Sequence, residues 1–335
     1  MTPKLRWFRR AALVATLLCA IVVVIGAWVR LTNAGLGCPD WPGCYGQVHP
    51  SQVAEIAGNA GAYQRALNEM VHRYIVGALG LFIVGLAAFS VWNRRDPAQP
   101  RVLPLVIVAL VVLQALLGMW TVTLLLKPLI VTLHLLGGLA TLSLLWWLAL
   151  SPERRELKAA ERPVRNLAIV AIAVVALQVS LGGWTSSNYA AAACADFPAC
   201  HGQWWPNMDF RNAFVLWRGL GIDYEGGVLD APARVAIHYS HRLGAYLTAL
   251  VLLLLVLGVW RRGQTLFTRA AGTAVLMALI LQLLIGMNLI WKGWPLWLGT
   301  LHNAGAAALV LAMVALLRSL APRPEGGPVR LRSGV

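Results

Sequence analysis

Residues 69–73 read Glu-Met-Val-His-Arg, and residues 238–242 read His-Tyr-Ser-His-Arg. A second pair of segments matches in the same way, because residues 133–137 read Leu-His-Leu-Leu-Gly and residues 301–305 read Leu-His-Asn-Ala-Gly. The spacing between the two histidines is 134 − 72 = 62 residues in the first half and 302 − 241 = 61 residues in the second. The sequence therefore predicts a duplicated fold that carries one pair of histidines in each copy.

The composition is that of an integral membrane protein. Of 335 residues, 59% are hydrophobic and only 12% are charged, and the mean hydropathy is +0.68. Because a spanning helix needs about 20 largely apolar residues, we predict an all-α fold with eight transmembrane helices. They cover residues 11–29, 71–92, 104–123, 129–150, 164–183, 234–259, 269–290 and 296–317. The first resembles a signal peptide, but no small-residue cleavage site follows it, so we expect a retained helix.

The net charge of +15 does not indicate nucleic-acid binding, because the basic residues alternate from loop to loop. The N-terminus, residues 93–103, 151–166 and 261–269, and the tail after 317 hold 19 of the 28 Lys and Arg residues. By the positive-inside rule these segments are cytoplasmic. We therefore predict an inner-membrane protein with both termini in the cytoplasm and with two long loops, 30–70 and 184–233, on the outer face.

Four of the five cysteines lie in these two outer loops. Cys38-Pro-Asp-Trp-Pro-Gly-Cys44 and Cys194-Ala-Asp-Phe-Pro-Ala-Cys200 have the same spacing, with Asp and Pro at the same positions. An outward loop is exposed to an oxidising compartment, so we expect the disulfides Cys38–Cys44 and Cys194–Cys200. The alternative for each pair is a redox-active dithiol that relays electrons. Cys19 lies within the first helix and is expected to be an inert core residue.

The duplication extends beyond the histidines. Gly26-Ala27-Trp28 precedes Cys38 by the same distance as Gly182-Gly183-Trp184 precedes Cys194, and a Leu-Gln-x-Leu-x-Gly-Met pattern occurs at 113–119 and 281–287. With four helices in each copy, the copies keep the same orientation, so we predict two four-helix bundles related by a pseudo-twofold axis along the membrane normal. The N-terminal bundle is residues 1–150 and the C-terminal bundle is residues 151–335. The Leu-Gln pattern is interpreted as helix packing with a buried amide hydrogen bond.

Intramembrane histidines are candidates for function, because an imidazole without a partner is costly to bury in hydrocarbon. In each copy the two histidines lie on neighbouring helices near their outer ends, which suits a metal or haem iron held by two imidazoles. Arg73 and Arg242 follow a histidine directly and are candidates for binding haem propionates. The alternative is that they only extend to the membrane interface. His49 and His201 have no match in the other copy and are expected to be surface residues.

The two copies differ at one position, where Glu69 of the first half is replaced by His238 of the second. Glu69 shares a helix face with His72, so a carboxylate would lie beside a bound macrocycle and act as a base or stabilise developing positive charge. The alternative is an ion pair between Glu69 and Arg73. His238 is either a third intramembrane ligand or a donor behind the ligands. This difference predicts a reactive first half and a permanent cofactor site in the second half.

The whole chain resembles the haem A synthase family, the membrane enzymes that convert haem O to haem A for terminal oxidases. The resemblance rests on Glu-x-x-His-Arg at 69–73, the histidines of the other helices, the duplication and the outer cysteine pairs. It implies that His241 and His302 ligate a haem b cofactor, that His72 and His134 hold the substrate haem, and that Glu69 is the essential acid. It also implies oxidation of the C8 methyl of haem O to a formyl group, with haem b passing electrons.

Other partners of the predicted enzyme are the lipid bilayer and an unidentified electron donor or acceptor. Further candidate partners are haem O synthase, an oxidase assembly factor and a second copy of the chain. Two rival functions are a di-haem b quinol cytochrome and a haem transporter. The Glu69/His238 difference argues against two equal electron-transfer sites. Trp204 and Trp205 are expected to be interfacial anchors rather than an outer haem-handling motif.

Overall fold

The computed structural model describes residues 2–48, 52–53, 59–150 and 157–321, and within these residues the protein is helical with no strand. The long helices are α1 (Pro3–Leu31), α3 (Ala60–Trp92), α4 (Val102–Thr123), α5 (Pro128–Ala149), α6 (Arg162–Ser187), α8 (Ala231–Arg262), α9 (Leu266–Trp291) and α10 (Leu296–Ser319). A short helix, α7 (Phe210–Ala213), lies between α6 and α8. Each of the eight long helices is long and apolar enough to cross a membrane. The predicted all-α fold and its eight spanning helices are confirmed.

Helix α3 begins eleven residues before the predicted start at residue 71, because it starts at Ala60. The side chain of Asn59 caps it by accepting a hydrogen bond from the backbone N–H of Ala62. The first three turns contain polar side chains such as Gln64 and Asn68, so a hydropathy pattern excludes them, although most of their residues favour a helix. His72 is therefore in the fourth turn of a helix that extends past the apolar stretch, rather than at the helix start.

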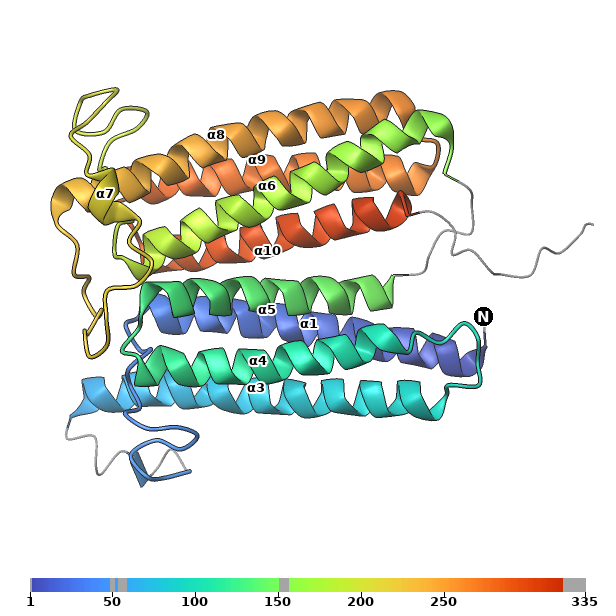
Figure 1. Cartoon of the computed structure of the whole chain (residues 1–335), viewed down its shortest axis with the longest axis horizontal. Coiled ribbons are helices and arrows are strands. Elements are labelled where there is room, and N and C mark those ends of the chain that lie inside the picture. Colours follow the sequence, from blue (N-terminus) through green and yellow to red (C-terminus); the bar gives the residue numbers. More distant parts are fainter. Residues whose placement is uncertain (1, 49–51, 54–58, 151–156, 322–335) are drawn as a thin grey trace, which may run out of the picture.

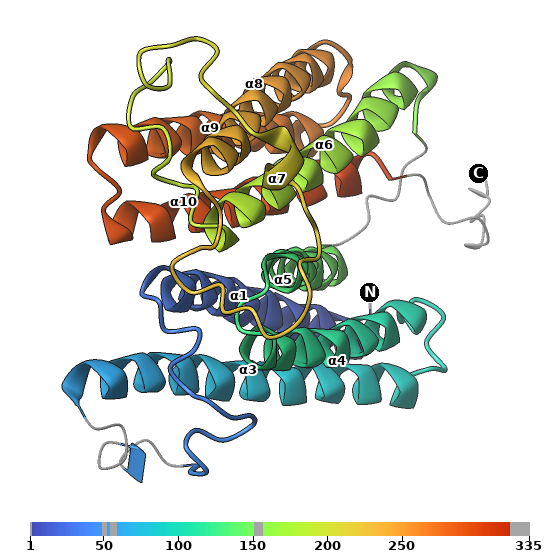
Figure 2. The same ribbon diagram turned by 60° about the vertical axis from the view of Figure 1, so that its left-hand side comes forward.

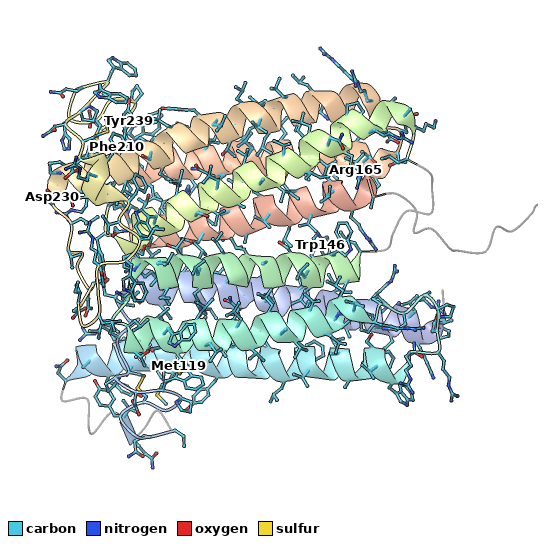
Figure 3. All side chains as sticks on the ribbon, in the orientation of Figure 1. Met119, Trp146, Arg165, Phe210, Asp230 and Tyr239 are labelled. Carbon is cyan, nitrogen blue, oxygen red and sulfur yellow. A yellow bond between two sulfur atoms is a disulfide. The ribbon has the colours of Figure 1, made fainter. Side chains whose placement is uncertain are left out.

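The helices form two groups of four (Figures 1 and 2). One group contains α1, α3, α4 and α5, and the other contains α6, α8, α9 and α10. Each group has its own apolar core: the first is centred on Phe8, Ile83 and Leu142, and the second on Leu252, Val259 and Leu316. The groups meet where α10 contacts α1 and α5, and where α5 contacts α6. At this junction the indole N–H of Trp146, labelled in Figure 3, donates to the carbonyl of Leu311 at 3.1 Å.

The two long loops lie at the same end of the protein. Figure 1 shows residues 32–48, which follow α1, and residues 214–230, which precede α8, together at one end, and the start of α1 with the end of α10 at the other. In Figure 3, Phe210, Asp230 and Tyr239 mark the loop end, and Arg165 marks the opposite end. The loop end is called the outer end below, following the orientation predicted from the basic residues. The pseudo-twofold axis, the cytoplasmic termini and the boundary between residues 150 and 151 remain predictions.

Candidate functional site

Each of the four predicted ligand histidines packs against a glycine of a neighbouring helix. His72 of α3 faces Gly26 of α1, His134 of α5 faces Gly118 of α4, His241 of α8 faces Gly182 of α6, and His302 of α10 faces Gly286 of α9. A Cβ atom added to each glycine would lie 3.1 to 3.4 Å from the Cε1 atom of the facing imidazole. Because glycine has no side chain, each of these four positions leaves the space that the facing imidazole occupies.

In the second half, the structure brings His241 and His302 together. Their ring centroids are 6.5 Å apart and the ring planes cross at 79°. Two metal–imidazole bonds of about 2 Å each, with half a ring on either side, would separate the ring centres by about 6 Å. The spacing therefore suits one iron held between these two side chains.

Glutamines contact the two histidines of this pair. The side-chain amide of Gln178 donates to the carbonyl oxygen of His241 at 3.0 Å and lies 3.1 Å from its Nδ1 atom, and the amide of Gln282 lies 3.3 Å from Nε2 of His302. The amide hydrogen bond predicted for helix packing is thus made with the candidate ligands themselves.

Three glutamines occupy matching places beside glycines. Gln114, Gln178 and Gln282 lie against Gly137, Gly244 and Gly305, and each of these glycines follows a candidate histidine by three residues. At the position of the first copy that corresponds to Gln178 the sequence has Val22, so His72 has no such amide beside it. Among the four histidines, His72 is therefore the one that lacks a glutamine.

Buried imidazole nitrogens without a partner support a ligand at these positions. The Nδ1 atoms of His72, His134 and His302 are buried and have no hydrogen-bond partner. No three His, Cys, Asp or Glu side chains gather into a possible metal site anywhere in the described residues. Two imidazoles alone are an incomplete set for a bare metal ion, but they complete the coordination of a haem iron, whose remaining ligands come from the macrocycle. The donor set fits haem.

Glu69 is buried at the outer end of the first half, with 5% of its surface exposed. Its Oε2 atom accepts a hydrogen bond from the backbone N–H of Cys38 at 2.9 Å, and its Oε1 atom lies 2.5 Å from Nη2 of Arg73. The ion pair considered from the sequence is therefore present. Oε2 thus ties the first outer loop to α3 and Oε1 pairs with Arg73 of the same helix, so the side chain has a fixed position one turn from His72.

His238 takes the same place in the second half. Its Nδ1 atom lies 3.1 Å from the carbonyl oxygen of Ala190, and its ring packs edge-on to Trp294 with centroids 5.8 Å apart. Like Glu69, it connects the helix to the outer loop of its own half. Because Nδ1 of His238 contacts this backbone carbonyl, the interpretation of His238 as a donor behind the ligands is favoured.

Arg73 and Arg242 each hold the cysteine loop of their own half. Arg73 donates to the carbonyls of Asp40 and Gly43 at 2.9 and 2.5 Å. Arg242 donates to the matching carbonyls of Asp196 and Ala199, both at 2.8 Å, and also to Cys194 at 3.0 Å. The guanidinium groups therefore lie at the outer end beside the histidines. Their binding of haem propionates remains a prediction.

The two cysteine loops have the same internal construction. Disulfides join Cys38 to Cys44 and Cys194 to Cys200, as predicted. In the second loop, the carboxylate of Asp196 accepts from the backbone N–H groups of His201 and Gly202 at 2.7 and 2.8 Å. These hydrogen bonds, above all that from Gly202, hold the pKa of the Asp196 carboxyl below its usual range. Asp40 accepts from the backbone N–H groups of Tyr45 and Gly46 in the same way.

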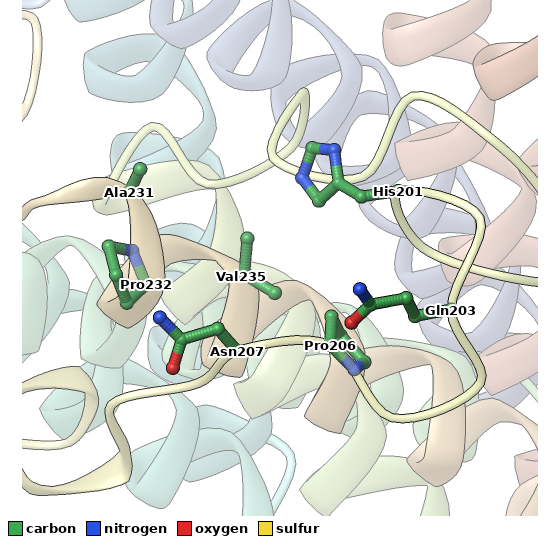
Figure 4. Close-up of a pocket in the computed structure, with 7 residues that line it drawn as sticks. All are labelled: His201, Gln203, Pro206, Asn207, Ala231, Pro232 and Val235. Atoms are coloured by element: carbon green, nitrogen blue, oxygen red, sulfur yellow. The ribbon is translucent and has the colours of Figure 1, made fainter.

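Among the described residues, His201 lies apart from these pairs. His201 is exposed, as predicted, and with Gln203, Asn207 and Val235 it lines an open pocket of about 240 Å³ beside the second disulfide (Figure 4). His49 lies outside the described residues. Cys19 is buried and unpaired, as expected, and Trp204 and Trp205 are exposed at the outer end.

The sequence interpretation missed the four glycines and the role of the glutamines. The signal was present, because Gly26 and Gly182 occupy the same position of the repeat and so do Gly118 and Gly286. Sequence spacing places such a glycine on a helix but does not show which residue of another helix it faces.

Comparison with known proteins gives one consistent result. The family model COX15-CtaA, described as cytochrome oxidase assembly protein, matches residues 9–314. The chain is 42% identical to a haem A synthase of Shewanella oneidensis over 93% of its own length and 96% of the relative. It is 28% identical to a haem A synthase of Caulobacter vibrioides, over 90% of this chain and 92% of the relative. It is 26% identical to one of Halalkalibacterium halodurans, over 84% and 86%.

Proposed function

The chain belongs to the COX15-CtaA family of cytochrome oxidase assembly proteins, and on this premise we propose that it is a haem A synthase that oxidises the C8 methyl group of haem O to a formyl group. The observation that carries the proposal is the pair His241 and His302, whose ring centroids are 6.5 Å apart. The repetition of two glycine-faced histidines in the first half supports a second haem site in the same protein. The relatives, each named haem A synthase, support the reaction class.

The two halves have different roles in this proposal. His241 and His302 hold haem b as a permanent cofactor, and each has a glutamine beside it that fixes its position. His72 and His134 hold the substrate haem. Since His72 lacks a glutamine, its imidazole is less constrained, which suits a ligand that must accept a substrate and release a product. Residues 1–150 thus form the substrate bundle, and residues 151–335 form the cofactor bundle.

Haem b, when bound, supplies electron transfer between an external partner and the substrate site. The other contributions come from the chain itself. Glu69 is held in a fixed position by Cys38 and Arg73, so its negative charge is preorganised near the substrate haem. A preorganised charge stabilises positive charge that develops at the methyl carbon as it is oxidised through the hydroxylated intermediate. Arg73 and Arg242 supply positive charge at the outer end, where the propionates of each haem would lie.

The protein lies in the inner membrane with the cysteine loops on its outer face. It takes haem O from the bilayer or from a haem O synthase and supplies haem A for oxidase assembly. The buried carboxylate of Glu69 in one half and His238 in the other argue against a cytochrome with two equal electron-transfer haems.

The test is to purify the protein in detergent and identify its extracted haems. Haem b together with haem O, hydroxylated haem or haem A is expected, whereas haem b alone would identify an electron carrier. In His241→Ala and His302→Ala, haem b should be lost, because one imidazole of the pair is removed. The matched control is His201→Ala, which removes an exposed histidine of the same half. Full haem b in both ligand variants would contradict the assignment.

A further inference from the structure

We propose that the exchange of Glu69 for His238 determines how firmly each half retains its haem, because only the first half places a carboxylate against the arginine that follows its histidine. This inference rests on the proposed function, because it assumes that each histidine pair holds a haem. It assigns to Glu69 a role in releasing the product that is separate from its role in oxidising the methyl group.

In the helix segments 60–73 and 231–242 and in the cysteine loops 38–44 and 194–200, the charged residues match one for one except at this position. Arg65 and Arg73 of the first half correspond to Arg234 and Arg242 of the second, and Asp40 corresponds to Asp196. These three pairs contribute the same charge to both halves. Within these segments Glu69 lowers the sum of the first half to zero, whereas the second, with His238 in its place, keeps one positive charge.

The charge of Arg73 is neutralised directly. Its Nη2 atom lies 2.5 Å from Glu69, and the two side chains are 15% and 7% exposed, so water screens the pair only weakly.

Arg242 has no such partner. Its guanidinium donates to three backbone carbonyls, it has no carboxylate within 4 Å among the described residues, and its Nε atom is buried without a hydrogen-bond partner. Carbonyl oxygens satisfy its hydrogen bonds but leave its unit charge intact. The second half therefore keeps a buried positive charge one residue from His241.

A haem carries two propionate carboxylates, which avoid hydrocarbon and turn toward the nearest aqueous surface. For both sites that surface is the outer end, where the arginines lie. An uncompensated positive charge there favours the bound haem, and a neutral arginine–glutamate pair does so much less. Half-buried charges separated by roughly 8 Å interact by about 2 kcal/mol, which is a factor of about 30 in an equilibrium constant.

The expected difference in haem affinity between the two halves has the direction that the reaction needs. A cofactor must stay bound through many turnovers, whereas a product must leave. The two halves are built alike, and the exchange of one charged residue gives them different affinities for haem.

The experiment measures haem release from each half of the full-length protein in detergent. A His241→Ala/His302→Ala background isolates the first half, and a His72→Ala/His134→Ala background isolates the second. Each protein is loaded with iron protoporphyrin IX and mixed with excess apomyoglobin, and the transfer of haem is followed by its Soret absorption. This readout requires no turnover.

In the first half, Glu69→Gln should slow haem release about tenfold or more, because glutamine keeps the size and the acceptor for Cys38 but removes the charge. In the second half, His238→Glu should speed release by a similar factor. The matched control is His238→Gln, which is neutral and should leave the rate within about twofold. Far-ultraviolet circular dichroism of each variant establishes that the helices are retained.

Release rates that do not differ between Glu69→Gln and the unchanged first half, or between His238→Glu and His238→Gln, would overturn the inference. That result would leave the proposed function intact, since both halves would still bind haem. Failure of the first-half background to bind any haem would overturn both. Equal acceleration by His238→Glu and His238→Gln would mean that the loop contact to Ala190, rather than the charge, retains the haem, and would also overturn the inference.

Discussion

At the scale of single residues, Glu69 makes a structural contact and, in the proposed function, supplies the charge that the oxidation needs. Its carboxylate holds the N–H of Cys38 and the guanidinium of Arg73. We expect Glu69→Gln to leave haem b and the fold intact and to stop conversion before the formyl product. A group that acts on developing charge affects the chemical step more than it affects binding of the ground state. Haem O, hydroxylated haem and haem A, measured in a strain that carries only this variant, provide the test.

If Glu69 acts only through its buried ion pair with Arg73, its replacement should lower the stability of the protein but leave haem A near normal. Near-normal haem A would therefore exclude the catalytic role. Gln64→Glu, which adds a carboxylate at an exposed position of the same helix, is the control for a general change of charge on α3.

The glycines that face the histidines give a second prediction. Gly182→Val should displace the imidazole of His241, because even the first added carbon would lie 3.2 Å from Cε1. The expected result is loss of haem b from the purified protein. Gly77→Val is the matched control, since it places the same side chain in a helix with no atom within 4 Å of its Cβ. Retention of haem b in Gly182→Val would show that haem b binding does not require a glycine opposite His241.

At the scale of elements, each cysteine loop is a small rigid unit attached to the helix that carries a histidine. A disulfide closes the loop, an aspartate binds two of its amides, and an arginine of the helix binds its carbonyls. The loop and the histidine are therefore connected through neighbouring residues of one helix, such as His72 and Arg73. A change in the loop should be transmitted to the proposed haem site through this connection.

The disulfides should resist alkylation in non-reduced membranes and become labelled after reduction, because the loops are predicted to face an oxidising compartment. All four cysteines are fully buried, so labelling should also require the loop to open. Each short disulfide is expected to stabilise its loop by about 2 kcal/mol. Labelling of Cys194 or Cys200 before reduction would indicate a reduced dithiol or an inverted topology. Cys19, which is buried in α1, serves as the internal reference for a thiol that only denaturation exposes.

At the scale of the whole molecule, the outer loop of the second half reaches across to the first. Lys127, at the hairpin between α4 and α5, is only 2% exposed and donates to the carbonyl of Gly219. Its ammonium lies 4.0 Å from the ring centroid of Trp217 and 5.5 Å from that of Tyr224. The N–H of Tyr224 donates to Leu125 in the same hairpin at 3.1 Å. This contact joins the outer loop to the helix that carries His134.

Lys127→Met should weaken the junction by about 1–3 kcal/mol, because methionine keeps the apolar stem but loses the hydrogen bond and the cation–π contacts. Hydrogen exchange followed by mass spectrometry should show faster exchange at residues 214–229. Lys292→Met changes the exposed lysine of the hairpin between α9 and α10 and should have no such effect. Unchanged exchange in Lys127→Met would exclude this role for the lysine.

The eight spanning helices, the cysteine pairing and the duplication were all predictable from the sequence. Hydropathy, loop charge and a repeat depend on residue order alone, and a short Cys-to-Cys spacing in an oxidising loop leaves few partners. The start of α3 was not predictable from hydropathy, because polar residues such as Gln64 continue a helix beyond its apolar part. Local capping by Asn59, rather than hydrophobicity, sets that boundary.

The contacts between helices could not be obtained from residue order. That Gly26 faces His72, that Gln178 reaches His241, and that Arg242 holds the loop carbonyls depends on how helices far apart in the chain rotate and cross. Helical periodicity assigns a residue to a face, but packing against other helices determines which residue that face meets. For the same reason, the sequence left two interpretations of Glu69 open, an ion pair with Arg73 or a catalytic role. The three-dimensional structure shows one carboxylate held in place by both Arg73 and the loop.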